Sequence, residues 1–315
     1  MTDEATRRAL DIGRQRARQA LALRGRGQQR RARALALRAA NDAALAGVGP
    51  VAPAALPAPR SDRNSAGLLL AEGDSWFDCP LNEVLKSLED EHGFDVESLA
   101  HAGDSLETMA YADGQLDKLA RRLERLLRDG RVPKAILLSG GGNDVAGPEF
   151  GMLLNHAGSK LPPLNEQVVA GVVDERMRLA LVTLVEAISQ VCRRSLTQPL
   201  PILLHGYDHP VPDGRGLLGG WSPLRGPWLA PGFSEKGYPP GAQRIAIAAR
   251  LIDRLNAMLA GVAALPEFAH VAWVDLRGSL SNGKDCKQSW ANELHPTRTG
   301  FDRVAQRFAA AIDRL

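Results

Sequence analysis

Short apolar runs alternate with stretches of helical periodicity from residue 67 to the end of the chain, and this alternation constrains the fold most. The runs occupy residues 68–71, 94–99, 135–138, 202–204 and 271–274, and each is too short for a buried helix. The helical stretches cover residues 81–91, 106–129 with a break near Gly114, 165–194, 242–264 and 297–315. Strands and helices in alternation predict a five-stranded parallel sheet covered on both faces, a three-layer α/β/α sandwich.

A basic segment precedes this domain. Residues 1–60 hold twelve arginines and four acidic residues, or +8, whereas residues 61–315 carry −5. We predict an Ala/Arg-rich helical arm over residues 1–46, with a break at Gly25 and Gly27, and a Pro/Ala linker over 47–65. Two interpretations stay open for the arm: a tether to an anionic surface or polymer without specific nucleic-acid recognition, or a solvated extension.

Composition restricts the compartment and the cofactors. The three cysteines, Cys79, Cys192 and Cys286, fit neither a disulfide framework nor a zinc pattern, which favours reduced thiols. No apolar run is long enough to span a membrane, and the N-terminus lacks the apolar core of a secretory signal, so we expect a cytoplasmic protein. His205 and His209 lie in a Pro/Gly-rich loop without a metal-binding helix, and we therefore expect no metal.

One segment of the domain is too rich in Gly and Pro for regular elements. Residues 205–240 follow the fourth predicted strand and carry Tyr207, Trp221 and Trp228. Long irregular loops inside compact domains tend to be functional. We predict that this loop, together with Trp76, forms an apolar wall or lid over a substrate pocket, with an ordered structural loop or an oligomer contact as the alternative.

Four polar segments stand at strand ends or before the last helix. They are Gly73-Asp74-Ser75, Ala102-Gly103-Asp104-Ser105, Ser139-Gly140-Gly141-Gly142-Asn143-Asp144 and Asn292-Glu293-Leu294-His295-Pro296. The carboxyl ends of parallel strands share one edge of a sheet, so all four segments can converge there. The set contains a hydroxyl, an imidazole, a side-chain amide and a bare backbone N–H, which acyl transfer through an oxyanion requires.

These segments, in this order, resemble the blocks of the SGNH (GDSL-type) hydrolase family, whose fold is flavodoxin-like, over residues 67–315. The resemblance implies that Ser75 is the nucleophile and His295 the general base. It also implies that the backbone N–H groups of Ser75 and Gly103 and the amide of Asn143 form the oxyanion hole. Asp74 and Asp144 are interpreted as loop scaffolding.

The chain departs from the family pattern at Asn292, where the family has Asp three residues before the histidine. An amide oxygen can orient the imidazole but does not stabilise its charged form as a carboxylate does. We expect Asn292 to serve in a weakened triad. Glu293, or a distant acid such as Asp208 or Asp275, could substitute, and a Ser–His dyad with a backbone carbonyl is the third possibility.

The resemblance implies a serine esterase that cleaves carboxylic esters through an acyl-serine, without metal or organic cofactor. Candidate substrates are lipid esters, short acyl esters and acetylated sugars. The Gly-x-Ser-x-Gly elbow of α/β-hydrolases and the glycine motifs of nucleotide-binding loops are both absent. The alternative is a binding or scaffold protein that keeps the hydrolase fold, has lost turnover at Asn292, and is tethered to an anionic partner by its arm.

Overall fold

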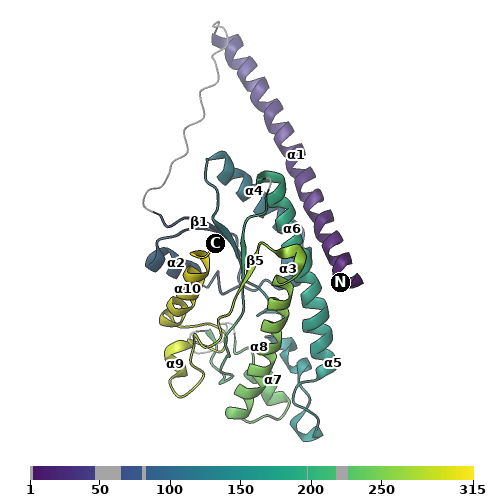
Figure 1. Ribbon diagram of the computed structural model, residues 1–315, viewed down its shortest axis with the longest axis vertical. Helices are drawn as coiled ribbons and strands as arrows, with labels where there is room; N and C mark the ends of the chain where they lie inside the picture. Colours follow the sequence, from purple (N-terminus) through teal and green to yellow (C-terminus); the bar gives the residue numbers. More distant parts are fainter. Residues whose placement is uncertain (1–2, 47–64, 80–82, 197, 218–225) are drawn as a thin grey trace.

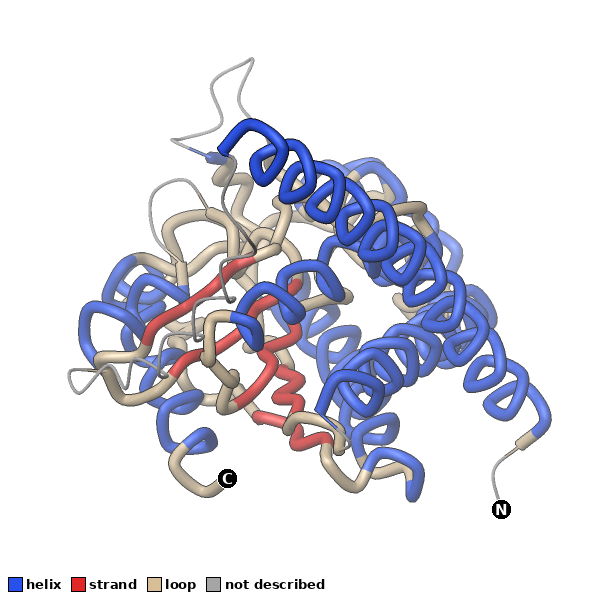
Figure 2. Tube along the Cα trace, turned by 90° about the horizontal axis from the view of Figure 1, so that it is seen from above, coloured by secondary structure: helices blue, strands red, loops and turns tan. Residues whose placement is uncertain are grey.

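A computed structural model describes residues 3–46, 65–79, 83–196, 198–217 and 226–315. Its centre is a parallel sheet with strand order β2-β1-β3-β4-β5 (Figures 1 and 2). The strands are β1 (Leu68–Glu72), β2 (Asp95–Ser98), β3 (Ala135–Leu138), β4 (Ile202–His205) and β5 (Val271–Val274). The predicted five-stranded parallel α/β fold is confirmed.

The central strands consist of apolar residues because both of their faces are covered. Every residue of β1, β3 and β4 is buried, and Leu70 of β1 pairs with Ile136 of β3, which pairs with Ile202 of β4. The edge strands are only partly buried, in keeping with Glu97 and Ser98 at one edge. Continuous apolar runs of this kind are typical of parallel sheets between two helical layers.

Helices cover both faces of the sheet (Figure 2). Helices α2 (Val84–His92) and α10 (Arg298–Ile312) contact each other on one face. The other face carries α3 (Leu106–Tyr111), α4 (Gln115–Arg128), α6 (Arg178–Leu196) and α8 (Ala242–Ala263), with α6 in contact with the other three. The predicted break near Gly114 separates α3 from α4.

Shorter elements complete the chain. Helix α5 (Glu166–Val169) continues through a π-helix (Ala170–Met177) into α6, so the predicted long helix here carries a π segment. Short 3₁₀ turns span Pro148–Leu153, Ala157–Ser159 and Pro266–Phe268, and α9 (Cys286–Ser289) precedes the last helix. In the described part of the segment 205–240, predicted as irregular, helix α7 spans Ala230–Glu235.

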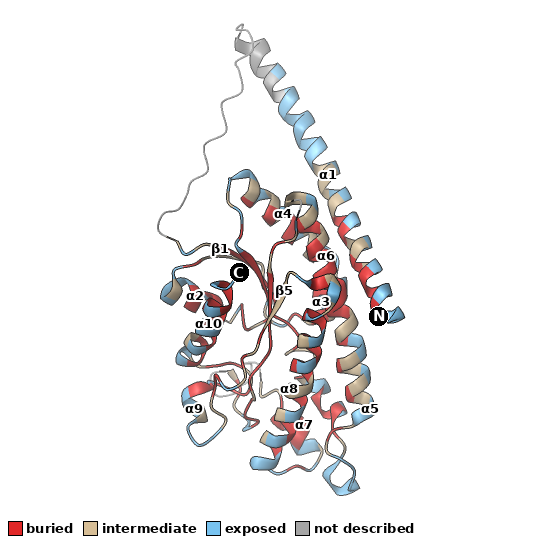
Figure 3. Ribbon diagram, in the orientation of Figure 1, coloured by how far each residue is buried: buried red, intermediate tan, exposed pale blue. Residues whose placement is uncertain are grey.

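The N-terminal segment forms one continuous helix, α1 (Glu4–Ala46), so the predicted break at Gly25 and Gly27 is wrong. Its first half packs against α6 and α4, and beyond that contact the helix is mostly exposed (Figure 3). The exposed part includes Arg26, Arg30 and Arg33. A Cβ at Gly13 would lie 2.6 Å from the Thr183 carbonyl oxygen, so glycine permits this close packing. The Arg14 guanidinium bonds Glu186 on α6 at 2.8 Å.

The remaining sequence predictions concern cysteines, spans and the linker. Cys79, Cys192 and Cys286 are free thiols, as the sequence predicted. No helix within the described ranges has both the length and the apolarity to cross a lipid bilayer. Most of the predicted linker, residues 47–64, lies outside the described residues. The anionic partner of the arm stays a prediction.

Candidate active site

Ser75, His295 and Asn292 form a hydrogen-bonded series at the carboxyl edge of the sheet. The Ser75 hydroxyl oxygen lies 2.8 Å from Nε2 of His295, and Nδ1 of the same ring lies 3.1 Å from Oδ1 of Asn292. Ser75 follows β1, whereas Asn292 and His295 lie between α9 and α10. Ser75 and His295 are 220 positions apart in the sequence. The fold thus brings together three of the residues that the sequence predicted.

The turn that carries His295 is held by backbone and side-chain contacts. Oδ1 of Asn292 also accepts the backbone N–H groups of Leu294 and His295, at 2.9 and 2.8 Å. The Trp76 indole N–H donates to the Leu294 carbonyl at 3.1 Å, which ties the serine loop to the histidine turn. The geometry of the pair therefore depends on Asn292 and Trp76.

Burial sets the protonation of His295. His295 is 7% exposed, and burial lowers the pKa of its imidazole to about 4, because the charged imidazolium loses its hydration. Asn292 supplies no negative charge to offset this loss. At neutral pH the imidazole is therefore neutral and carries one hydrogen. That hydrogen is on Nδ1 and is donated to Asn292, so the lone pair of Nε2 faces the Ser75 hydroxyl.

Glu293, one alternative for the third member, has a different role. Its buried carboxylate accepts four backbone N–H groups of the 205–240 loop: Gly214 and Ala230 at 2.9 and 3.1 Å on Oε1, and Trp228 and Leu229, both at 2.7 Å, on Oε2. Both oxygens are thus committed to the loop. Glu293 holds the loop against the histidine turn instead of orienting His295.

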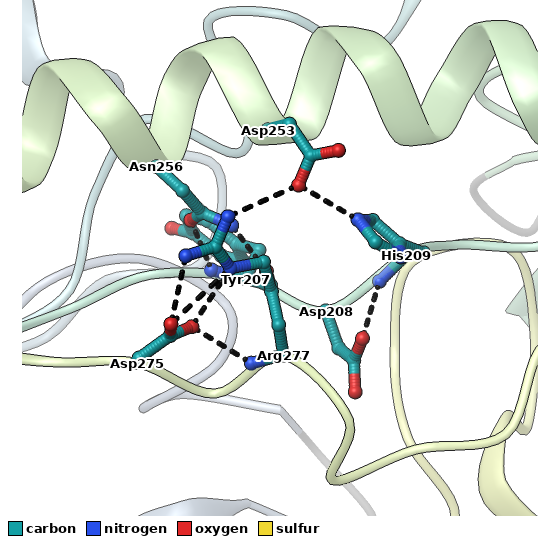
Figure 4. A network of polar contacts seen from close by, with 7 residues as sticks. All are labelled: Tyr207, Asp208, His209, Asp253, Asn256, Asp275 and Arg277. Atoms are coloured by element: carbon teal, nitrogen blue, oxygen red, sulfur yellow. Dashed lines mark hydrogen bonds and ion pairs between the residues drawn. The ribbon is translucent and has the colours of Figure 1, made fainter.

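The distant acids are also occupied, as Figure 4 shows. The carboxylate of Asp208 accepts the backbone N–H groups of His209 and Leu280, at 2.8 and 2.7 Å. Asp275 is bound by the guanidinium of Arg277, which lowers the pKa of the carboxyl group. Among the four acceptors that the sequence offered for His295, only Asn292 bonds the ring.

The predicted oxyanion donors lie on neighbouring loops. Asn143, after β3, donates one N–H of its amide to the Asp104 carbonyl at 2.9 Å, which leaves its second N–H for a ligand. Gly103 directly precedes Asp104 and adopts φ 98°, a conformation that favours glycine. Asn143 and Ser75 line the same pocket, whereas Gly103 is not among the residues that line it.

Beneath Ser75 lies a second polar cluster that the sequence did not reveal. Oδ1 of Asp74 accepts the backbone N–H of Trp76 at 3.0 Å and lies 2.6 Å from the Ser139 hydroxyl, and Oδ2 accepts the Tyr207 hydroxyl at 2.8 Å. The Ser139 hydroxyl also lies 2.7 Å from Nε2 of His205. All of these side chains are buried, so this cluster fixes the loop before the nucleophile candidate.

Other sequence-predicted residues are placed as follows. Asp144 accepts the backbone N–H of Leu106 at 3.0 Å, a contact typical of loop scaffolding, and burial raises its pKa to about 6. Trp76 and Tyr207 line the pocket beside Ser75. The Trp228 ring packs edge-on against His295 with centroids 5.5 Å apart. Trp221 lies outside the described residues.

The pocket also has a wall that sequence reasoning missed. It includes Phe150 from the 3₁₀ turn after β3 and Ala248, Leu251 and Ile252 from α8. The last three recur at helical spacing, but that pattern indicates only a buried helix face, not which part of it borders a pocket.

No family model and no curated protein matches the chain. Among solved structures it is similar to a family 3 carbohydrate esterase from Clostridium thermocellum, at 14% identity and TM-score 0.43, over 78% of this chain and 96% of that one. A candidate SGNH hydrolase from Slackia heliotrinireducens has the same identity and score over 78% and 98%. A catalytic mutant of the acetylxylan esterase Axe2 from Geobacillus stearothermophilus is 16% identical, with TM-score 0.40 over 79% and 95%. We assign the fold from the strand order of the sheet itself. Similarities this distant do not establish the reaction or the substrate of this protein.

Proposed function

We propose that the protein is an SGNH-type serine hydrolase that cleaves carboxylic esters through an acyl-Ser75 intermediate. The observation that carries the proposal is the series Ser75–His295–Asn292 at the edge of a pocket that Asn143 also lines. A hydroxyl becomes a nucleophile when a positioned base takes its proton and donors stabilise the oxyanion. The site offers both.

The proposed acylation proceeds in two steps. The Ser75 oxygen attacks the ester carbonyl carbon while its proton passes to Nε2 of His295, and the carbonyl oxygen becomes an oxyanion. The free N–H of Asn143 and the backbone N–H groups of Ser75 and Gly103 donate to that oxygen. The C–O bond to the alcohol then breaks, and His295 returns the proton to the leaving alkoxide, which gives an alcohol and an acyl-serine.

Deacylation repeats the sequence with water as the nucleophile. His295 takes one proton from water, the hydroxide adds to the acyl carbon, and the Ser75 oxygen leaves and regains the proton. The products are a carboxylic acid and the free enzyme. No step requires a metal or an organic cofactor.

Asn292 makes this a site with an uncharged third member. Its oxygen fixes the tautomer in which Nδ1 carries the hydrogen, so Nε2 can accept the Ser75 proton. The imidazolium formed during the reaction gains a hydrogen bond but no opposite charge beside Nδ1. We therefore expect slower turnover than an aspartate would support, and activity that persists to low pH.

The test is hydrolysis of p-nitrophenyl acetate by the full chain and by Ser75→Ala and His295→Ala. The proposal expects turnover above the rate of the buffer in the wild-type protein and loss of that turnover in both variants. Equal rates for the wild-type protein and Ser75→Ala, with both folded by circular dichroism, would instead support the scaffold alternative.

A further inference from the structure

The pocket beside Ser75 has an apolar wall built from three segments. Val145 and Ala146 come from the loop after β3, Phe150 from the following 3₁₀ turn, and Leu251 and Ile252 from α8. The cavity volume is about 40 Å³, and the empty space rises to about 560 Å³ only when open solvent at the mouth is included. Apolar contact is therefore what this surface offers a ligand.

Apart from Ser75, Asn143 and the indole nitrogen of Trp290, the polar side chains that border the pocket are bonded to other protein groups. Both oxygens of Asp74 accept hydrogen bonds, one of them from the Tyr207 hydroxyl, which is donated in full. Both oxygens of Asp208 accept backbone N–H groups, one from Leu280 and one from His209; the bond to His209 is drawn in Figure 4. The Trp290 indole nitrogen is buried and has no partner among the described residues, and Trp290 lines the pocket.

The segment that carries Tyr207 and Asp208 is rigidly attached to α8. The side-chain amide of Asn256 accepts the backbone N–H of Tyr207 at 2.9 Å and donates to its carbonyl at 2.8 Å. Asp253, one turn earlier on α8, bonds His209 at 3.0 Å (Figure 4). The polar groups are thus held in their bonds and are not available to a substrate.

The site geometry decides which part of an ester enters this pocket. The leaving alcohol has to lie beside His295, which returns its proton. Ser75 and Asn143, the proposed contacts of the ester carbonyl, border the pocket, whereas Nε2 of His295 faces the Ser75 hydroxyl. We therefore place the acyl part of the substrate, which carries that carbonyl, in the pocket.

We propose that the acyl group is uncharged, apolar and longer than acetyl. A charged or hydroxylated acyl chain would lose its hydration without gaining a partner, which disfavours its binding. The wall is formed by side chains of three segments, so a chain longer than acetyl gains more apolar contact than one methyl group does. This inference rests on the proposed function and specifies its substrate as an ester of an aliphatic or aromatic acid, not a sugar acetate.

The first test measures kcat/KM for p-nitrophenyl acetate, butyrate, hexanoate and monosuccinate. Each methylene buried in the pocket contributes about 0.8 kcal/mol, so kcat/KM should rise about fourfold per methylene until the pocket is full. The monosuccinate, whose chain matches the butyrate in length but ends in a carboxylate, should be at least tenfold poorer than the butyrate. Acetate as the best substrate, or a monosuccinate equal to the butyrate, would overturn the inference.

Matched variants on α8 locate the effect. Ala248 borders the pocket and is buried, whereas Ala246 on the same helix is exposed. Ala248→Leu should lower the hexanoate-to-acetate ratio of kcat/KM about tenfold, and Ala246→Leu should leave that ratio unchanged. A ratio that responds equally to both substitutions, or to neither, would contradict the proposed pocket.

A binding measurement separates this inference from the proposed reaction. Ser75→Ala is titrated with 2-octanone and with acetone, neutral ketones that mimic the ester carbonyl, and the fluorescence of Trp76 and Trp290 reports occupancy. The inference expects 2-octanone to bind at least tenfold more tightly even if the wild-type protein cleaves no ester. Equal affinity would reject the apolar acyl pocket while leaving the hydrolytic proposal intact.

Discussion

Two serine–histidine pairs lie near each other at the carboxyl edge of the sheet, an outer pair, Ser75 with His295, and an inner, fully buried pair, Ser139 with His205. Ser75 lies 2.8 Å from His295, and Ser139 lies 2.7 Å from His205. Asp74 connects the two, since it directly precedes Ser75 and bonds the Ser139 hydroxyl at 2.6 Å. Distance alone would make both pairs equally plausible nucleophiles.

The order of the hydrogen-bonded side chains distinguishes the two pairs. In the outer set the imidazole lies between the hydroxyl and Asn292, so it can take a proton on one nitrogen while the other is held. In the inner set the Ser139 hydroxyl lies between Asp74 and His205. Its proton is committed to that series, and the residue is fully buried. Only the outer serine combines a free base with a pocket.

A hydrogen count shows how the inner set is held. Nδ1 of His205 lies 2.6 Å from the Gly206 carbonyl oxygen, so Nδ1 carries a hydrogen. Ser139 has one hydrogen to donate but two acceptors beside it, Asp74 and Nε2 of His205. The single hydrogen of Ser139 is donated to Asp74, and burial lowers the pKa of His205, so the ring is neutral. The inner set is thus a buried structural unit.

Substitution of the two serines should produce the largest contrast. Ser75→Ala removes the proposed nucleophile and should lower kcat by a factor of about 10⁴ or more, as loss of a triad member does elsewhere. Ser139→Ala should retain most of the turnover, measured on the same p-nitrophenyl ester. If Ser139→Ala is folded but as inactive as Ser75→Ala, the assignment of the chemistry to Ser75 and His295 alone is wrong.

Asn143→Ala should have the next largest effect. Loss of one oxyanion donor typically lowers kcat by about 10²–10³, because the charge on the oxygen develops without its partner. Steady-state kinetics should show this loss mainly in kcat, with KM little changed. A decrease of less than threefold would place Asn143 outside the oxyanion hole.

Asn292→Asp should increase activity by at least about tenfold at neutral pH. A carboxylate beside Nδ1 favours the imidazolium, so it raises the pKa of His295 from about 4 and makes the ring a stronger base. In the wild-type protein kcat/KM should fall as the pH drops through about 4, and in the variant this fall should occur at higher pH. Superimposable pH profiles would contradict the role of Asn292.

The smallest effect concerns stability. Ser139→Ala leaves buried acceptors of Asp74 and His205 without their shared donor, at a cost of about 1–3 kcal/mol. Urea unfolding should show this decrease in the free energy of unfolding. The same measurement on Ser75→Ala should show less than 1 kcal/mol, since Ser75 is only partly buried. The reverse order would remove the distinction between a structural and a catalytic pair.

The strands and the outer site could be predicted because their signals are local. A run such as Leu68–Ala71 and the polar residues after it are contiguous in the sequence, and the parallel sheet then places the strand ends together. The continuity of α1 could not be predicted in the same way. Gly25 and Gly27 each cost about 1 kcal/mol in a helix, yet the long helix continues through them.

The roles of Glu293 and Ser139 were beyond the reach of the sequence for a different reason. Glu293 accepts N–H groups that lie 63–79 positions away, and Ser139 meets Asp74 and His205 over 65 and 66 positions. No periodicity links such partners, because tertiary packing alone decides which loop reaches which side chain. The docking of α1 is similar, since its contact face consists mostly of small residues such as Ala9 and Ala17, with Leu10 beside them, and its apolar stripe is therefore weak.

The most direct measurement is peptide mapping of the full chain after reaction with a fluorophosphonate, which labels serines activated by a neighbouring base. We predict one adduct per molecule, on the peptide that contains Ser75, that is absent from Ser75→Ala and retained in Ser139→Ala. A folded protein that takes up no label, or an adduct on Ser139 in place of Ser75, would contradict the account.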